Sequence, residues 1–373
     1  MPEIWLRYGT TDVVLDIRFE NLANQISSAF QALSEEKIKT ALASSVQLTD
    51  KMLLLVLSSS KATSKIIKIL VDEARKKGFS VTIDVPHKMA NTLLTSFAGN
   101  ETITINRVDY RSLNTRLSKF QSTIIVSSIA YDPLFGFAGA PTTLLRNLLA
   151  EQMAKAFKAR KDNRPAPGVM GGPLDVATSA IEGIQAQCIE LVANNENIAG
   201  VHIGTIKEAF DKAIAQLQSI SAIETESVKC AIISTDDQAN GHSTLATALN
   251  SLWNSTHIVK EGGTAILLAE SREGIGGEAL QMFIEGRLKP DQLHQAPYID
   301  GLEHLLFMKE LLQKYELGLV STLPHYYVRT KLGFTVYTSM KDILQKFAEN
   351  YGKNFKALVF SDASVILLKP KAG

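Results

Sequence analysis

The sequence predicts an α/β protein made of two doubly wound α/β domains with an interdomain cleft. Strands and helices alternate in both halves of the chain, which is typical of this class. The apolar run Lys51–Leu57 resembles a central parallel strand buried on both faces. The stretch Lys260–Glu278 joins an apolar run to a glycine-rich loop and then a helical pattern, the usual layout of an α/β ligand site.

Length and composition limit the possible classes of protein. The 373 residues suggest two domains at ~150 residues per domain, and 45% hydrophobic residues give both a core. With 39 Lys plus Arg against 38 Asp plus Glu, the net charge of +1 makes nucleic-acid binding an unfavoured function. No apolar run approaches the ~20 residues of a membrane span, so no membrane partner is expected.

The N-terminus and the cysteines predict a cytoplasmic protein. The first residues lack the basic-then-apolar layout of a signal peptide. Cys188 and Cys230 lie in apolar surroundings and are expected to be buried thiols rather than a disulfide. They form no Cys-x-x-Cys pair, and the histidines show no ligand spacing, so no metal site is expected.

The first half begins with a hairpin and continues with a βαβ unit. Helical spacing of apolar residues over Ser64–Lys77 follows the strand Lys51–Leu57, Gly78 ends that helix, and Phe79–Val85 is the next strand. The other expected elements of this half are the hairpin strands Ile4–Gly9 and Thr11–Ile17, helices at Asn21–Leu33 and Glu35–Ala43, strands at Thr102–Val108 and Thr123–Ser128, helices at Leu144–Phe157, Ala177–Val192 and Ile206–Leu217, and a strand or sheet edge at Val201–Gly204.

The second half repeats the alternation. Its expected elements are strands at Cys230–Ser234, Thr264–Ala269 and Leu317–Ser321, helices at Thr244–Leu252, Gly301–Lys314 and Met340–Asn350, and a closing strand or hairpin at Ala357–Phe360 and Val365–Leu368. We place the N-terminal domain at residues 1–222 and the C-terminal domain at 223–356. The closing segment 357–373 could pack back on the N-terminal domain.

Candidate ligand-binding residues gather at the ends of predicted strands, where ligands bind in doubly wound sheets. Glycines let the backbone approach a ligand and helix starts favour anions, although a tight turn or an N-cap explains the same residues equally well. The candidates are Ser59, Ser60, Lys61, Lys88, Gly136, Gly139, Thr142, Thr143, Gly274, Gly276 and Gly277. Candidate acids or bases are His87 and Asp132, each also compatible with an ordinary turn.

Read in order, these segments resemble the nickel-dependent lactate racemase family, whose cofactor is a nickel-pincer nucleotide. Lys260–Glu278 is similar to the family's Lys-Glu-Gly-Gly-Thr, strand, and Arg-Asp-Gly-x-Gly-Gly-Glu. Gly136–Gly139 is similar to the start of its Gly-Phe-Ser-Gly-Gly-Arg-Lys-Ser, and the order of elements matches over nearly the whole chain. The resemblance implies two α/β domains with a cofactor in the cleft. It also implies a 2-hydroxy-acid racemase, an isomerase that uses hydride transfer and two histidine bases.

This chain departs from the family at the reaction centre. His87 matches one catalytic histidine, but Asp132 falls near the position of the other. Thr142 replaces the lysine that tethers the pincer, and no histidine lies near Lys158, where the family has its nickel ligand. Ser60–Ser64 replaces Asp-His-Thr-Arg-Pro, Lys88 replaces an arginine, and Asn250 replaces a substrate-contacting lysine. We therefore expect no nickel-pincer cofactor.

Three functional hypotheses follow. The first is a lactate-racemase-like protein without pincer-dependent racemase activity that binds a small anionic or nucleotide-like ligand in the interdomain cleft. The second is an active isomerase on another 2-hydroxy acid, with His87 and Asp132 as its bases. The third is a non-catalytic regulatory or interaction protein that uses the basic segment 155–164. The sequence leaves the oligomeric state, the ligand and the question of catalysis open.

Overall fold

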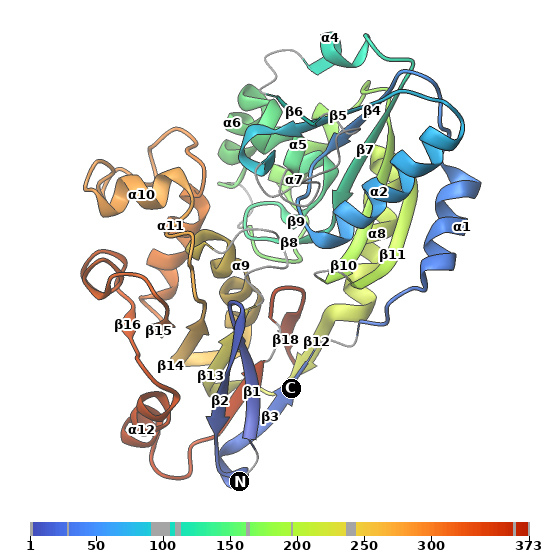
Figure 1. Cartoon of the computed structure of the whole chain (residues 1–373). Coiled ribbons are helices and arrows are strands. Elements are labelled where there is room, and N and C mark those ends of the chain that lie inside the picture. The colour runs from blue at the N-terminus through green and yellow to red at the C-terminus, as the bar shows by residue number, and fades with distance from the viewer. Residues whose placement is uncertain are drawn as a thin grey trace. The chain divides into compact units, whose positions relative to one another are not determined.

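The computed structural model describes residues 3–27, 30–90, 105–108, 113–161, 165–194, 197–235, 244–360 and 363–371. The chain divides into two compact units. The central unit consists of Phe30–Ile220 and Ala239–Gly241, and the terminal unit consists of Met1–Ala29, Ser221–Gln238 and His242–Gly373. Each unit is built on its own six-stranded sheet, with helices alongside (Figure 1).

The central unit has the strand order β11-β10-β7-β4-β5-β6. Five of these strands are parallel, and β11 is antiparallel to β10. The strands are β4 (Met52–Val56), β5 (Val81–Pro86), β6 (Ile105–Val108), β7 (Ser122–Ser128), β10 (Gln187–Asn194) and β11 (Asn197–Thr205). A two-stranded hairpin of β8 (Ala130–Asp132) and β9 (Gly136–Ala138) follows β7.

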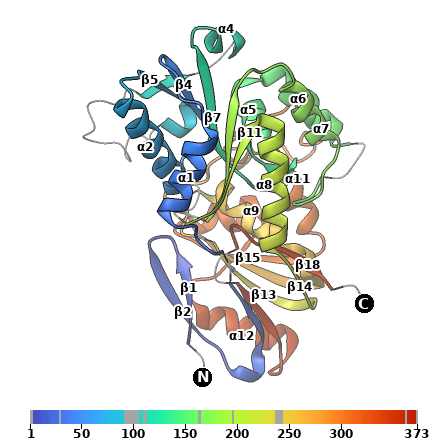
Figure 2. The same ribbon diagram turned by 90° about the vertical axis from the view of Figure 1, so that its right-hand side faces the viewer.

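Helices cover both faces of this sheet, so the central strand is buried on each side. Met52, Leu54 and Val56 of β4 pack with α1 and α2 in one core, whereas Leu55 packs with α5 and α8 in the other. The alternation follows from the two-residue period of a strand and confirms the predicted buried strand. Figure 2 shows α1 and α2 together on one side of β4 and β7. The helices are α1 (Glu35–Ser45), α2 (Lys61–Lys76), α4 (Leu113–Leu117), α5 (Ala140–Leu148), α6 (Ala150–Ala159), α7 (Gly172–Ala180) and α8 (Ile206–Ser221).

The terminal unit has an all-parallel sheet with the order β16-β15-β14-β13-β17-β3. Its strands are β3 (Leu22–Ile26), β13 (Val228–Ser234), β14 (Val259–Leu268), β15 (Glu316–Val320), β16 (Thr335–Val336) and β17 (Ala357–Phe360). Its helices are α9 (Leu245–Ser255), α10 (Glu278–Ile284), α11 (Leu302–Leu311) and α12 (Met340–Tyr351). The hairpin of β1 (Glu3–Tyr8) and β2 (Thr11–Asp16) and the pair of β12 (Ala222–Thr225) with β18 (Leu367–Pro370) complete it.

The predicted helix Asn21–Leu33 is wrong, because this segment adds an edge strand to the terminal unit. β3 pairs in parallel with β17. The buried Asn21 side chain donates hydrogen bonds to the carbonyl oxygens of Lys353 at 2.8 Å and Phe355 at 2.9 Å, which holds the segment next to β17. Local apolar spacing does not reveal this long-range pairing.

The same pairing changes the expected domain boundaries. Residues 1–29 cluster with the second half of the chain rather than with residues 30–220. The closing segment also belongs there, because β17 pairs with β13 and β3, and β18 pairs with β12. The closing segment thus pairs with strands from both expected domains, at residues 22–26 and 222–234, and all of them belong to the terminal unit.

Two predicted helices have different limits. The helix expected at Ala177–Val192 ends at Ala180, and β10 begins at Gln187. Gly183 lies between them with a φ of 91°, a backbone conformation that cannot continue a helix. The helix expected at Leu144–Phe157 is α5 and α6, separated at Leu149, whose φ of −130° and ψ of 65° are not helical.

The two cysteines have the apolar environment that the sequence predicts. Cys188 in β10 and Cys230 in β13 are both buried. In the described part of the chain, no helix combines the length and apolar character needed to cross a bilayer. Burial raises the pKa of both thiols, to about 12 for Cys230.

Candidate ligand site at the strand ends of the central unit

The strand order of the central unit contains one topological switch point, between β4 and β7. From β4 the chain passes through α2 to β5 and β6 on one side, and β7 then pairs with the other side of β4. The backbone N–H of Leu57 donates to the Val126 carbonyl at 2.8 Å, which keeps the two strand ends together. Because α2 and α5 pack on opposite faces, the connections after β4 and β7 diverge there. Ligands in doubly wound sheets bind at this position.

The turn after β4 supplies three of the sequence candidates. Ser60 is the N-cap of α2, and its hydroxyl accepts a hydrogen bond from the Thr63 N–H at 3.2 Å. Ser59 is buried next to it, whereas the Lys61 side chain is exposed at the first position of the helix. The local fold therefore uses the Ser60 hydroxyl for capping and leaves the Lys61 ammonium facing solvent.

His87 and Lys88 follow β5 in a short 3-10 helix, His87–Met89. β5 is the neighbour of β4, so this turn lies at the same edge of the sheet. The His87 side chain is exposed, and the described residues provide no hydrogen bond to it. The Lys88 side chain lies outside the described part of the structure. His87 is therefore available at the surface.

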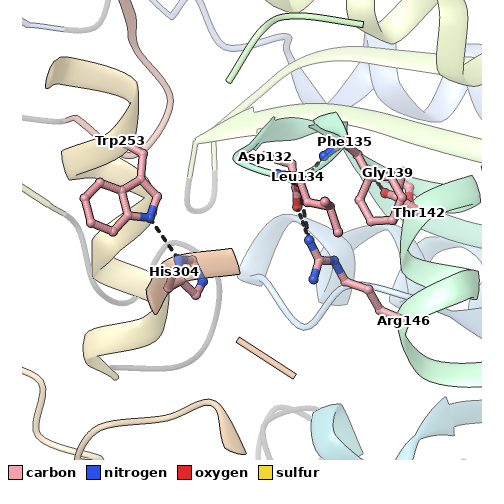
Figure 3. Close-up of polar contacts among 8 residues, drawn as sticks. All are labelled: Asp132, Leu134, Phe135, Gly139, Thr142, Arg146, Trp253 and His304. Carbon is pink, nitrogen blue, oxygen red and sulfur yellow. Dashed lines mark hydrogen bonds and ion pairs between the residues drawn. The ribbon is translucent and has the colours of Figure 1, made fainter. Parts of the chain in front are cut away.

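Asp132, the second candidate base, is held in a buried ion pair. Its carboxylate contacts the Arg146 guanidinium at 2.8 and 3.1 Å and accepts hydrogen bonds from the N–H groups of Leu134 and Phe135 at 2.8 Å each (Figure 3). The guanidinium of Arg146 also lies 5.0 Å from the centre of the Phe135 ring. Both carboxylate oxygens thus have structural partners, which connect the β8–β9 hairpin to α5.

The start of α5 is capped by the side chain of Thr142, a residue of the same helix. The Thr142 hydroxyl is fully buried, accepts from the Gly139 N–H at 3.0 Å and donates to the Gly139 carbonyl at 3.1 Å. A Cβ at Gly139 would lie 2.5 Å from the Phe210 ring, so this position requires glycine for space. Thr143 is half-buried, and its carbonyl accepts from the Asn147 side chain at 2.9 Å. This geometry is that of an N-cap, one of the two readings that the sequence leaves open.

Glu190 is the part of this site that the sequence analysis missed. Its carboxylate accepts a hydrogen bond from the Ala140 N–H at 2.9 Å, at the first residue of α5. The side chain is fully buried, and within the described residues its other oxygen, Oε1, has no hydrogen-bond partner. The available signal is a single acidic residue inside the apolar strand Gln187–Asn194.

Burial decides the charge of Glu190. Desolvation raises the pKa of this carboxyl to about 8, against smaller lowering effects of the hydrogen bond from Ala140 and of the nearby Ser127 hydroxyl. The group is therefore largely protonated at neutral pH. The Glu190 carboxyl group already accepts the hydrogen bond of the Ala140 N–H. The start of α5 therefore has one N–H donor fewer for an anionic ligand than a helix start without such a contact.

The glycine loop of the terminal unit also has a structural use. The carbonyl groups of Gly274 and Ile275 accept hydrogen bonds from the first two N–H groups of α9, at 3.0 Å from Leu245 and 2.9 Å from Ala246. Gly274, Gly276 and Gly277 have φ values of 90°, 65° and 66°. The loop therefore needs glycines for its backbone shape, and it caps α9.

The terminal unit contains a second buried polar group of residues around α9. The indole N–H of Trp253 donates to Nδ1 of His304 at 2.9 Å (Figure 3). On the same helix, the buried amide of Asn254 and the Oδ1 atom of Asn250 have no hydrogen-bond partner among the described residues. Asn250 and Asn254 are four residues apart, so they share one face of α9. The sequence analysis noted Asn250 only as a replaced lysine.

The basic segment 155–164 is described as far as residue 161, so Arg164 falls outside the described residues. Lys155 and Lys158 are exposed on α6, and the Arg160 guanidinium lies 3.5 Å from the centre of the Phe157 ring. Over the described ranges, no three His, Cys, Asp or Glu side chains are grouped as metal ligands would be.

Comparison with known proteins relates the chain to solved structures. A scan of known protein families finds no match, and a search among curated proteins finds none either. The structure is similar to the lactate racemase apoprotein from Thermoanaerobacterium thermosaccharolyticum, with a TM-score of 0.78 and 15% identity over 99% of this chain and 100% of that chain. It is also similar to a protein from Thermotoga maritima, with a TM-score of 0.67 and 11% identity over 91% and 99% of the two chains. The chain has a lactate-racemase-like α/β fold.

Proposed function

We propose that this chain is a lactate-racemase-like protein that binds a small anionic or nucleotide-like ligand and does not racemise 2-hydroxy acids by the nickel-pincer route. The observation that carries the proposal is the switch point between β4 and β7, where Ser59–Lys61 and the glycine-rich segment Gly136–Thr143 follow adjacent strands. A lysine and a histidine stand exposed at this edge, at positions 61 and 87.

The residues at the start of α5 do not fit a tethered pincer. A covalent link of that kind needs a side-chain amine. Position 142 instead carries a buried hydroxyl that is hydrogen-bonded to both the N–H and the carbonyl group of Gly139. The first N–H of the helix is bonded to Glu190. These contacts support a helix start that has been converted to structural use.

Asp132 supports the same interpretation. A general base must be able to reach the proton that it removes. The Asp132 carboxylate is instead occupied by the Arg146 guanidinium and by two backbone N–H groups. We therefore assign ligand contacts to Lys61 and His87, and structural stabilisation to Asp132.

The negative half of the proposal is tested by racemisation. Purified protein would be incubated with the nickel-pincer nucleotide and with D- or L-lactate, and the ratio of the enantiomers followed by chiral chromatography. We expect no turnover above the protein-free control, and intact mass spectrometry should show no adduct. Racemisation that depends on protein, or a covalent pincer adduct, contradicts the proposal.

The positive half is tested by binding. Calorimetric titrations would use L-lactate and AMP as a 2-hydroxy acid and a nucleotide. His87→Ala should weaken binding about tenfold, the effect of one hydrogen bond to a charged group. His325→Ala removes another exposed histidine, outside the central unit, and should leave binding unchanged. No binding of either ligand, or equal loss in both variants, would count against the strand-end site.

A further inference from the structure

A concave surface of the central unit lies between α1 and α2, on their solvent side. It encloses about 520 Å³ and is lined along α2 from Lys61 to Lys76 and on α1 by Glu35 and Lys39. Both views of the chain show α1 and α2 side by side (Figures 1 and 2). We call this surface the α1–α2 groove. Its volume is within the range of about 300–1,000 Å³ that small-molecule sites occupy.

The groove carries a row of lysines. Lys61, Lys65 and Lys68 of α2 all line it. Their spacing of four and three residues puts them on one side of the helix, over about 10 Å at the ~1.5 Å rise per residue. Within the described residues, Lys61 and Lys65 belong to no ion pair, in contrast to two other lysines of the groove.

Acidic residues of the groove are balanced by close neighbours. Glu35 pairs with Lys39 at 2.6 Å, and Glu73 pairs with Lys76 at 2.6 Å. Lys39 and, less strongly, Lys65 lower the pKa of the Glu35 carboxyl. The positive charge of Lys65 on α2 therefore acts on a carboxylate of α1, on the other side of the groove. The lining contains five lysines against Glu35, Asp72 and Glu73, which leaves an excess positive charge of two.

Ser64 adds a second, independent observation. It lines the groove between Lys61 and Lys65, and only 6% of its surface is exposed. Its hydroxyl makes no hydrogen bond within the described residues. A buried hydroxyl without a partner costs free energy, so a bound acceptor at this point would remove that cost.

We propose that the α1–α2 groove binds a short, multiply charged phosphate anion. Lysine ammonium groups act as point charges for phosphate. The lining has no aromatic side chain and only one apolar residue, Ile69, so it offers no platform for a base or other apolar group. Single-stranded nucleic acid, which depends on such stacking, is disfavoured on this ground. The charges fit the phosphate chain itself.

This site extends beyond the proposed strand-end function. Lys61 stands where the two regions meet, but Ser64, Lys65 and Lys68 belong to the groove alone. Variants of Lys65 therefore test the groove, and His87→Ala tests the strand ends. The two proposals can fail separately.

The experiment is a calorimetric titration of the full chain with inorganic tripolyphosphate at low and at physiological salt. Lys65→Gln combined with Lys68→Gln should weaken binding about tenfold, as expected for the loss of two charge contacts at the surface. The matched control is Lys37→Gln with Lys77→Gln, an exposed lysine of α1 and the exposed C-cap lysine of α2, neither of which lines the groove. The control should bind tripolyphosphate within about twofold of the parent, because exposed charges outside the groove are largely screened by salt.

Ser64→Ala separates a ligand contact from a structural residue. If the hydroxyl bonds to phosphate, tripolyphosphate affinity falls about fivefold in this variant, the effect of one hydrogen bond. An unchanged affinity in the Lys65 and Lys68 double variant, or an equal loss in the control, overturns the proposal. So does an oligothymidylate that binds the groove more tightly than tripolyphosphate, because it would identify nucleic acid as the ligand.

Discussion

The carboxyl group of Glu190 accepts a hydrogen bond from the backbone N–H of Ala140 at 2.9 Å, although 50 residues separate the two in sequence. This contact connects β10 to the first residue of α5 inside the core of the central unit. It places an ionisable group at the helix start that the sequence had marked for an anionic ligand. The properties of this region therefore depend on the protonation of one side chain.

Glu190 should make the stability of the protein depend on pH. Its pKa is raised in the folded chain to about 8, so its stabilising contribution is complete below the usual value near 4.5 and is lost as the pH rises to about 8. Over that window the free energy of unfolding should fall by about 1.4 kcal/mol per pH unit from this group. Glu190→Gln cannot titrate and should lack this slope. Urea unfolding of both proteins between pH 5 and pH 9 measures the difference.

Glu182→Gln provides the control for that experiment. Glu182 is exposed and lies between α7 and β10, close to Glu190 in sequence. Its removal should leave the slope of the parent protein unchanged. If the Glu190→Gln variant follows the parent at every pH, the raised pKa of Glu190 is wrong.

The ion pair of Asp132 and Arg146 should be a major source of stability for the glycine-rich segment. The side chains are only 10% and 18% exposed, so Asp132→Ala removes the carboxylate that faces a largely buried guanidinium. Removal of one member of a buried pair costs about 3–5 kcal/mol. The free energy of unfolding in urea measures this loss. Asp211→Ala breaks the exposed pair with Lys207 and should cost less than ~0.5 kcal/mol.

A different substitution of Asp132 tests the two-base hypothesis. If Asp132 is structural, Asp132→Asn should retain most of the ligand affinity measured for the parent protein, because the amide keeps the shape of the carboxylate. A large loss of affinity or turnover in a folded Asp132→Asn protein would instead show that its charge acts on the ligand.

Periodicity predicted the α/β class because the relevant patterns are local. The strand β4 and the helix α2 follow from a continuous apolar run and a helical repeat, and both occur close to the predicted positions. The edge strand β3 does not follow from its own residues, since the contacts of Asn21 are made with residues more than 330 positions later. Assignment of residues 1–29 to the terminal unit depends on that pairing.

The candidate site was predictable in part for a similar reason. Strand ends and glycines marked Ser59–Lys61, His87 and Gly136–Gly139, because turns at the end of parallel strands have a typical composition. The bonding of each side chain was not predictable. Asp132 pairs with Arg146 of the following helix, and the Thr142 hydroxyl is hydrogen-bonded to Gly139 at the start of its own helix. Whether a polar residue serves a ligand or the fold is decided by such contacts.

Thr142 should stabilise α5 through its hydroxyl. Thr142→Ala removes both hydrogen bonds to Gly139 and should cost about 1–2 kcal/mol, the range for loss of a helix cap. Thr142→Ser retains the hydroxyl and should recover most of that loss. Thermal unfolding of the three proteins measures the effect. If the serine variant is as unstable as the alanine variant, packing of the threonine methyl group is responsible instead.

Gly136 should tolerate no side chain, because a Cβ atom would overlap with the neighbouring backbone. A second glycine with a similar φ separates this steric effect from backbone strain. Its φ is 79°, and a Cβ atom would lie 2.0 Å from the Val169 carbonyl oxygen. Gly183 has a similar φ of 91°, but nothing lies within 4 Å of its Cβ position. Gly183→Ala should therefore cost only about 1 kcal/mol, from the left-handed backbone. Gly136→Ala should cost several times more, because the backbone at Val169 must move, and its midpoint of urea unfolding should be lower. Equal losses of stability in the two variants would show that the backbone around Val169 moves aside at little cost in free energy.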